Sequence, residues 1–371
     1  MKMEECKVKT QVDNKVRAYI GETPVVLSRI LEERQSILSE LVDLVTGQDV
    51  SNILIVGSGS SYHSAVAVQA FVEKSLQMAV KVQYPTRFTN EVIAPEKGTL
   101  VIGISQGGKS LSTLRAISKA QEGGLKTVGI TATKDSELAK RPDLFVPIAC
   151  GEEQAGAKTK GVAATMLTLL LLGLEVGKKQ GYYEEQAYQE WIRKIEATIE
   201  NLPVVIASAE SWVNQYMNEF SVAPQLMVIG YGPHYAIALE GGLKILETVR
   251  IPALGYEMEE YMHGIYNCIN EDNHLIFLAS EGAAEEQRRL LKMRKFLGEH
   301  TLKTYVIGGK DIQRESGRDL LMPLVNDPIL SIFEYLIPLQ LIAALVPLKK
   351  GINPAIPKFT SFHQQMGSKL Q

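Results

Sequence analysis

Cysteine is scarce in this sequence. The three cysteines, Cys6, Cys150 and Cys268, are odd in number, far apart and outside any C-x-x-C pair. This spacing argues against a disulfide framework and against a zinc site, and it fits a reducing cytoplasm. No other cluster of metal-ligand residues is visible, so we expect a protein that uses no metal and no other cofactor.

Excess charge and long apolar runs are also missing. The formal net charge is -3 at pH 7 and no block of Lys and Arg stands out, which argues against nucleic-acid binding. The N-terminus carries acidic residues and no apolar run, so we expect no secretory signal there. The longest apolar stretch, 161–177, is at the lower limit for crossing a bilayer. We therefore expect a buried core or interface helix and no membrane contact.

Short apolar strand patterns alternate with helical patterns along most of the chain. The spacing predicts strands at 52–57, 80–85, 99–105, 126–132, 144–149, 225–230, 274–280, 303–308 and 320–325. It predicts helices at 60–77, 109–122, 161–178, 234–248, 283–298 and 330–347. This alternation is typical of an α/β fold in which a doubly wound parallel sheet carries helices on both faces.

The pattern occurs twice. "ILIVGSGSSYHSAV" from Ile53 and "LMVIGYGPHYAIAL" from Leu226 share a strand, a G-x-G turn and a tyrosine three residues after the second glycine. We expect a duplicated domain, with copies at 25–182 and 221–350. The remaining segments are an N-terminal extension (1–24), a linker of two helices separated by proline (183–220) and a C-terminal tail (351–371).

The glycine-rich stretch at 57–61 favours a phosphate site, since free amides at a helix N-terminus bind anions. Tyr62 stands where a dinucleotide-binding loop has its third glycine, no acid follows about 20 residues on, and the P-loop lysine is missing. The hydroxyls of Ser58, Ser60 and Ser61 instead suit a small phosphate monoester. A second loop of this kind, "ISQGGKS" at 104–110, again follows a strand.

These residues resemble the tandem SIS (sugar isomerase) domain family. The matching motifs are "GSSY" (59–62), "SQGGKSLS" (105–112), "GEEQAGAKTK" (151–160) and "ALEGGLKILE" with "EEYMHG" (238–264). The resemblance implies a small sugar phosphate as substrate. It also implies a binding site made of Gly59, Ser60, Ser61, Ser105, Gln106, Gly107, Ser110, Lys158, Thr159, Glu240 and Lys244. Gly107 and Lys158 stand where the family usually has serine.

Glu240, Lys244 and Glu247 are spaced to share one face of a helix, which Leu239, Leu243 and Leu246 would partly bury. A solvated, salt-bridged face is the plain interpretation of such a triplet. A desolvated carboxylate one turn from a lysine can instead act as a base. The resemblance implies that Glu247 is this base. It also implies that His263 assists ring opening from the neighbouring subunit of a homodimer or larger homo-oligomer.

The chain departs from the glutamine–fructose-6-phosphate amidotransferases, which the isomerase motifs also resemble. We find no glutaminase domain or N-terminal catalytic cysteine, and Phe362 stands where those enzymes have a lysine. The resemblance therefore implies a deglycase. Such an enzyme cleaves a fructosamine 6-phosphate, for example fructoselysine 6-phosphate, to glucose 6-phosphate and an amine through a 1,2-enaminol. The alternatives are an aminosugar phosphate deaminase or isomerase of the glucosamine 6-phosphate type, and a non-catalytic phosphosugar sensor.

Overall fold

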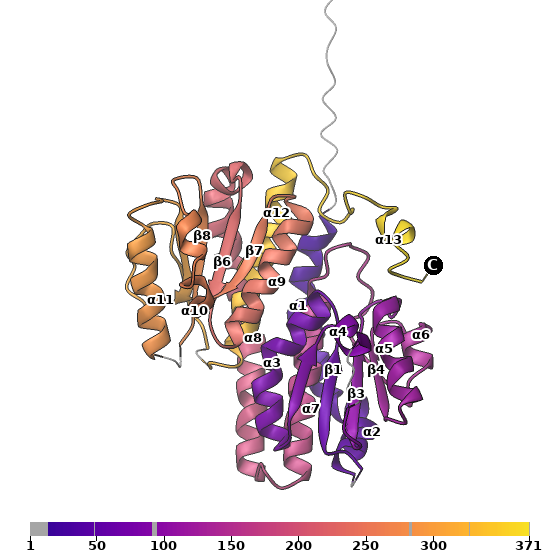
Figure 1. Cartoon of the computed structure of the whole chain (residues 1–371). Helices are drawn as coiled ribbons and strands as arrows, with labels where there is room; N and C mark the ends of the chain where they lie inside the picture. The colour runs from indigo at the N-terminus through magenta and orange to yellow at the C-terminus, as the bar shows by residue number, and fades with distance from the viewer. Residues whose placement is uncertain (1–13, 48, 91–94, 282–283, 326, 371) are drawn as a thin grey trace, which may run out of the picture.

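The computed structural model describes residues 14–47, 49–90, 95–281, 284–325 and 327–370 (Figure 1). Within these residues the chain forms two five-stranded parallel sheets, with the strand orders β2-β1-β3-β4-β5 and β10-β9-β8-β6-β7. Helices surround each sheet, and Figure 1 shows the sheets in two lobes, the first purple and the second orange. The expected doubly wound α/β fold is confirmed. Cys6 and the first part of the expected N-terminal extension lie outside the described residues.

The first half of the chain builds the first domain, whose strands begin and end close to the expected positions. Its elements are α1 (Lys15–Glu32), α2 (Arg34–Thr46), β1 (Asn52–Val56), α3 (Ser60–Leu76), β2 (Val80–Gln83), α4 (Pro85–Asn90), β3 (Thr99–Ile104), α5 (Leu111–Glu122), β4 (Thr127–Thr131), α6 (Glu137–Lys140), β5 (Leu144–Pro147) and α7 (Lys160–Lys179).

The second half repeats the arrangement. Its elements are α8 (Glu185–Val222), β6 (Leu226–Gly230), α9 (Pro233–Thr248), β7 (Ala253–Glu257), α10 (Met258–Tyr261), η1 (Ile265–Cys268), β8 (His274–Ala279), α11 (Ala284–Leu297), β9 (Thr304–Gly309), β10 (Leu320–Met322), α12 (Ser331–Lys349) and α13 (Phe362–Gln365).

The backbone confirms the duplication at the turn that opens each domain. Gly59, before α3, has φ 56° and ψ -129°, and Gly232, before α9, has φ 52° and ψ -136°. A positive φ of this kind favours glycine over residues with a Cβ atom. Two equivalent turns have therefore kept the same unusual conformation and the same residue.

Two sequence expectations about secondary structure are wrong. The segment expected as two helices is one continuous 38-residue helix, α8, with Pro203 inside it. Its buried residues, from Tyr188 to Phe220, lie on both sides of Pro203, so packing along the whole helix outweighs the hydrogen bond that proline removes. The strand β7 was not expected at all, because its sequence "ALGYE" lacks a continuous apolar run and only its first residue, Ala253, is buried. In addition, α1 begins at Lys15, inside the segment expected as an extension.

The two most apolar helices, α7 and α12, form the centre of the molecule. Each is long and apolar enough to cross a membrane by length and composition, but 94% and 89% of their most apolar windows are buried inside the fold. The expectation of a buried helix at 161–177 is confirmed. Residues of α1, α7, α8 and α12 belong to one continuous hydrophobic core that reaches both sheets. The two domains are thus joined by shared packing.

Candidate active site

The two expected phosphate loops lie at the carboxyl end of the first sheet. β1 leads into residues 57–61 and β3 into residues 105–110, and the two strands pair in parallel with Val56 opposite Gly103. The next strands, β2 and β4, lie on opposite sides of this pair, so the chain leaves the two loops in opposite directions. Ligands of doubly wound sheets bind in the crevice at such a point. The structure brings together at this edge Gly59, Ser60, Ser61, Ser105, Gln106, Gly107 and Ser110.

In the second loop, Ser110 caps α5. Its Oγ accepts hydrogen bonds from the Thr113 amide at 3.5 Å and from the Thr113 hydroxyl at 3.1 Å. Gly108 has φ 63°, and a Cβ atom there would lie 2.0 Å from Ser136 Oγ, so the turn requires glycine. A Cβ atom on Gly107 would meet nothing within 4 Å. The fold therefore does not require glycine at position 107, where the family usually has serine.

A buried carboxylate that the sequence did not single out organises the third motif. Glu153 accepts hydrogen bonds from Gln106 Nε2 at 2.8 Å, from the Thr159 amide and hydroxyl at 2.5 and 2.8 Å, and from the Gly161 amide at 3.2 Å. Lys158 Nζ donates to the Glu153 carbonyl at 2.5 Å. Burial lowers the pKa of Lys158, and Glu153 opposes that effect. Gln106 and Thr159 thus support the loop around Glu153. The third position of the G-x-E motif was the available signal for this role.

The expected charged face of α9 is present and mostly buried. Lys244 Nζ lies 2.6 Å from Glu247 Oε2 and 3.5 Å from Glu240 Oε1. The Glu240 and Lys244 side chains are 1% and 2% exposed, while that of Glu247 is 36% exposed. One buried ammonium is therefore shared by two carboxylates, and only Glu247 is open to solvent and to a ligand.

The electrostatics around Glu240 and Lys244 keep these two side chains charged. Burial alone would raise the pKa of Glu240, but Lys244, His63 and Ser60 outweigh burial and the pKa lies below its ordinary value. Burial likewise would lower the pKa of Lys244, but Glu240 and Glu247 outweigh it and the pKa is raised. Glu240 and Lys244 are thus held in their charged forms, as a proton-transfer site with a fixed cation requires.

Glycines bring α9 close to its neighbours. A Cβ atom on Gly242 would lie 2.8 Å from the Gly255 backbone nitrogen on β7, and one on Gly255 would lie 2.3 Å from Ala238 and Leu239 backbone atoms. Gly241 faces Leu339 of α12 in the same way. Glycine inside a helix costs about 1 kcal/mol relative to alanine. Here the glycines let the helix that carries Glu240, Lys244 and Glu247 approach β7 and α12 closely.

Glu240 also joins the two domains. Ser60 Oγ donates to Glu240 Oε1 at 2.9 Å, and His63 Nδ1 lies 2.8 Å from Glu240 Oε2. Ser60 and His63 belong to the first turn of α3, beside the first phosphate loop. The Ser60 hydroxyl, expected to bind phosphate, thus donates to a carboxylate of the other domain. His63 was not expected in the site, and its position one turn after Ser60 was the available signal.

His263 lies apart from the triad. It follows α10, its side chain is 70% exposed, and its Nε2 lies 3.9 Å from Glu259. Among the described residues, no hydrogen bond or ion pair connects His263 with Glu240, Lys244 or Glu247. A single chain therefore does not bring the two expected catalytic residues into contact.

The C-terminal tail contacts both the third motif and the second phosphate loop. The Gly156 amide donates to the Ala355 carbonyl at 3.0 Å, and Lys369 pairs with Ser110 in an antiparallel bridge. The Leu370 amide donates to the Lys109 carbonyl at 3.0 Å. Burial and the charge of Lys158 lower the pKa of Lys369, while Glu247 opposes them. The tail therefore adds a second lysine, Lys369, to the surroundings of Glu247.

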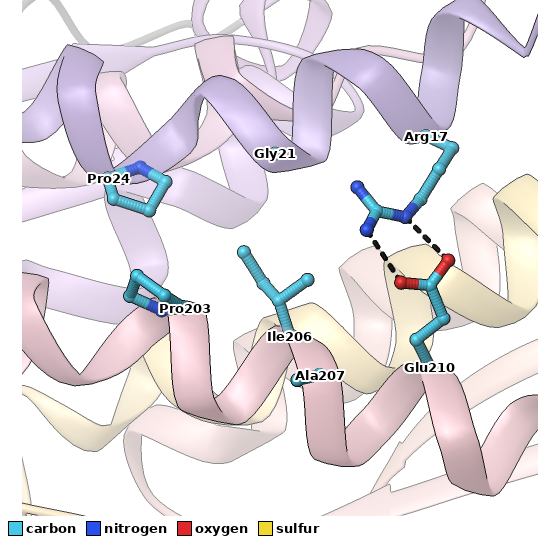
Figure 2. A pocket seen from close by; sticks show the side chains of 7 residues that line it. All are labelled: Arg17, Gly21, Pro24, Pro203, Ile206, Ala207 and Glu210. Atoms are coloured by element: carbon cyan, nitrogen blue, oxygen red, sulfur yellow. Dashed lines mark hydrogen bonds and ion pairs between the residues drawn. The ribbon is translucent and has the colours of Figure 1, made fainter.

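A hollow of about 280 Å³ lies between α1 and α8. Figure 2 shows the residues that line it. Arg17 closes one side of it with two hydrogen bonds to Glu210, at 2.8 and 2.6 Å. Pro24 and Pro203 face each other across the other side (Figure 2). The only charged groups in the lining are already paired with each other, so the hollow offers no group for chemistry.

Comparisons with known proteins place the fold among enzymes and binding proteins of sugar phosphates and sugars by similarity alone. A glutamine–fructose-6-phosphate aminotransferase (isomerizing) of Zymomonas mobilis is 27% identical over 350 residues, covering 91% of this chain and 56% of that protein. The chain thus spans little more than half the length of the curated relatives it matches. A solved structure from Clostridium difficile 630 is described as a proposed phosphosugar isomerase. It is 34% identical to this chain with a TM-score of 0.88, and the match covers 96% of this chain and 99% of that one.

Two further structures extend the range of similar proteins. One, from Salmonella typhimurium LT2, is described as a proposed sugar binding protein. It is 32% identical to this chain with a TM-score of 0.81, and the match covers 90% of this chain and 99% of that one. A glucosamine-6-phosphate deaminase of Thermotoga maritima shares the fold, with a TM-score of 0.70 and 20% identity over 93% of this chain and 97% of that one.

The family model of the SIS domain matches residues 48–174 and again 219–346. These two matches coincide with the two sheets and with the duplicated turns at Gly59 and Gly232. The chain therefore belongs to the SIS domain family, as a tandem pair of SIS domains.

Proposed function

We propose that the protein is a phosphosugar-processing enzyme, a deglycase that cleaves a fructosamine 6-phosphate to glucose 6-phosphate and a free amine. The observation that carries the proposal is the triad on α9, in which the partly exposed Glu247 lies 2.6 Å from the buried Lys244. A sensor would need the phosphate loops but not a buried cation shared by two carboxylates.

The phosphate is anchored by the loops at 57–61 and 105–110, whose hydroxyls and amides suit a monoester dianion. Lys158 and Thr159 support that end of the site from the third motif. With the phosphate fixed, C1 and C2 of the open-chain ketosamine are held near Glu247. Such positioning of the reacting atoms supplies much of the rate enhancement in enzymes of this kind.

Glu247 removes a proton from C1 while the C2 carbonyl oxygen gains one, which gives the 1,2-enaminol. Glu247 then returns its proton to C2 as the nitrogen loses its proton, which gives an aldimine at C1. Water adds to the aldimine and expels the amine, leaving glucose 6-phosphate. Lys244, 2.6 Å from Glu247 Oε2, holds the Glu247 carboxylate in place. Each positioned proton transfer of this kind contributes about 10²- to 10⁴-fold, and no step requires a metal.

His263 assists opening of the sugar ring from a second copy of the chain. Three features of the second domain support a homodimer. His263 is 70% exposed and separate from the triad of its own chain. β7 is an edge strand of the second sheet. Leu254 on β7 and Leu246 on α9, which packs on β7, expose apolar side chains, and such edges and patches are typical of protein interfaces.

The main alternative is a deaminase or isomerase of the glucosamine 6-phosphate type, in which the same groups act and ammonia is the amine. The fold shared with the Thermotoga maritima deaminase keeps this alternative open.

The buried free thiol of Cys150 fits the reducing cytoplasm that we propose as the location.

The test is to incubate the protein, with EDTA present, with fructoselysine 6-phosphate, other fructosamine 6-phosphates and glucosamine 6-phosphate. Released glucose 6-phosphate, fructose 6-phosphate and amine are then measured. We expect glucose 6-phosphate and free amine from a fructosamine 6-phosphate. Turnover of glucosamine 6-phosphate alone would establish the alternative, and binding without turnover would establish a sensor.

A further inference from the structure

The hydrogen bond between His63 and Glu240 connects the two domains at the base of the α9 triad. The His63 side chain is 11% exposed and its Nδ1 lies 2.8 Å from Glu240 Oε2, which is 177 residues away in the sequence. Glu240 is buried and its pKa is lowered, with burial opposed by Lys244, His63 and Ser60. An ionised carboxylate only accepts hydrogen bonds, so Nδ1 of His63 carries the proton in this contact.

The two oxygens of Glu240 have different partners. Oε2 faces His63, while Oε1 accepts from Ser60 at 2.9 Å and lies 3.5 Å from Lys244. Lys244 is closer to Glu247, at 2.6 Å. Ser60 and His63, both on α3, thus each donate a hydrogen bond to one carboxylate oxygen of Glu240. The ammonium of Lys244 is left closest to Glu247.

Without the His63 donor, Oε2 of Glu240 would be a buried, charged acceptor with no partner, which is strongly unfavourable. The hydroxyl proton of Ser60 is already donated to Oε1, so Lys244, 3.5 Å from Oε1, is the cation able to replace the donor, and it would have to move away from Glu247. We propose that His63 is a positioning residue: by donating Nδ1–H to Glu240 it keeps Lys244 on Glu247 and holds α9 against the phosphate loop. The inference rests on the proposed function, in which Glu247 is the base.

Substitution by asparagine separates this role from direct chemistry. The Nδ2 amide of asparagine is as many bonds from Cβ as histidine Nδ1, so His63→Asn keeps a donor at that place and removes Nε2. His63→Ala removes both. His300→Asn, at an exposed position in the turn after α11, is the matched control.

Steady-state kinetics on the fructosamine 6-phosphate that the wild type turns over test the role. We expect His63→Ala to lower kcat about 10- to 100-fold with KM within about twofold. We expect His63→Asn to retain kcat within about threefold of the His300→Asn control. If His63→Ala retains the wild-type kcat, or if His63→Asn is as impaired as His63→Ala, the positioning role is overturned.

A second measurement does not depend on turnover or on the folding of the alanine variant. In wild-type protein labelled with ¹⁵N-histidine, the resonances lost in His63→Asn identify His63. We expect a protonated Nδ1 and a change in its shift in Glu240→Gln. A proton on Nε2 alone would overturn the inference. If no phosphosugar is turned over but Nδ1 is protonated and sensitive to Glu240, the proposed function fails while the contact between the domains stands.

Discussion

Gly107 occupies an exposed position in the second phosphate loop where a Cβ atom would meet nothing within 4 Å. Its φ angle is not positive, in contrast to that of Gly108. A serine at position 107 would add one hydroxyl donor to the loop without backbone strain. Its neighbour Gly108 has no such room, because a Cβ atom there would lie 2.0 Å from Ser136 Oγ.

We predict that Gly107→Ser lowers KM for a sugar phosphate about 3- to 10-fold with little change in kcat, because one hydrogen bond to a charged group is gained. The measurement is steady-state kinetics, with Gly108→Ser as the contrasting variant that we expect to lose stability. A higher KM in Gly107→Ser would show that the loop does not contact the phosphate at this position.

At the same scale, the sequence predicted contacts within an element better than contacts between elements. Glu240, Lys244 and Glu247 lie on successive turns of one helix, so helical spacing alone placed them together. His63 and Glu240 are separated by 177 residues, and their contact depends on how α3 packs on α9. No spacing in a single sequence reports that packing.

At the scale of elements, buried apolar strands and helices were predictable and marginal ones were not. β7 lies at a sheet edge and only its first residue, Ala253, is buried, so it lacks the continuous apolar pattern of the central strands. In α8, the sequence signal of Pro203 was outweighed by packing of the helix along its whole length. The location of the interface between α3 and α9 also depended on tertiary packing.

Glu334 on α12 connects that helix to α8 and to the loop between β10 and α12. Its Oε1 accepts from Asn201 Nδ2 at 2.6 Å and from the Val325 amide at 3.1 Å. Among the described residues, its buried Oε2 has no hydrogen-bond partner. Burial raises the pKa of Glu334 from 4.5 to about 7, with Asn201 opposing. The folded protein thus holds a proton there over a pH range in which the unfolded chain has released it.

The sign of the pH effect follows from this difference. Between pH 4.5 and about 7 the folded state binds more protons at Glu334 than the unfolded state, so Glu334 makes stability fall as pH rises. We predict that Glu334→Gln, which does not titrate, gains about 1–3 kcal/mol relative to the wild type on going from pH 4.5 to pH 8. Denaturant unfolding of both proteins at several pH values measures this, and a difference independent of pH would contradict it.

At the scale of the whole molecule, one duplicated unit has taken two roles. The first copy carries the hydroxyl-rich turn after Gly59, and the second carries the charged face of α9 after Gly232. The shared core of α1, α7, α8 and α12 fixes the two copies relative to each other. His263 is exposed in the single chain, so the proposed mechanism requires a second chain to complete the site.

Mixing two inactive variants tests that requirement. In a dimer of His263→Ala with Glu247→Gln, one site carries both changes and the other carries neither. We predict that unfolding and refolding the two variants together restores roughly a quarter of the wild-type activity, since half of the random dimers are mixed. Each variant refolded alone is the control. Mixed dimers without activity would show that both residues act within one chain.

The most direct test of the central claim, that Glu247 removes a proton from C1 of a phosphosugar, uses fructoselysine 6-phosphate deuterated at both C1 positions. We predict that the wild type releases glucose 6-phosphate with one deuterium at C1 and the other at C2 or lost to water. We also predict that Glu247→Gln is slower by about 10²-fold or more. Release of fructose 6-phosphate with both deuterium atoms still at C1, or unchanged turnover by Glu247→Gln, would contradict the account.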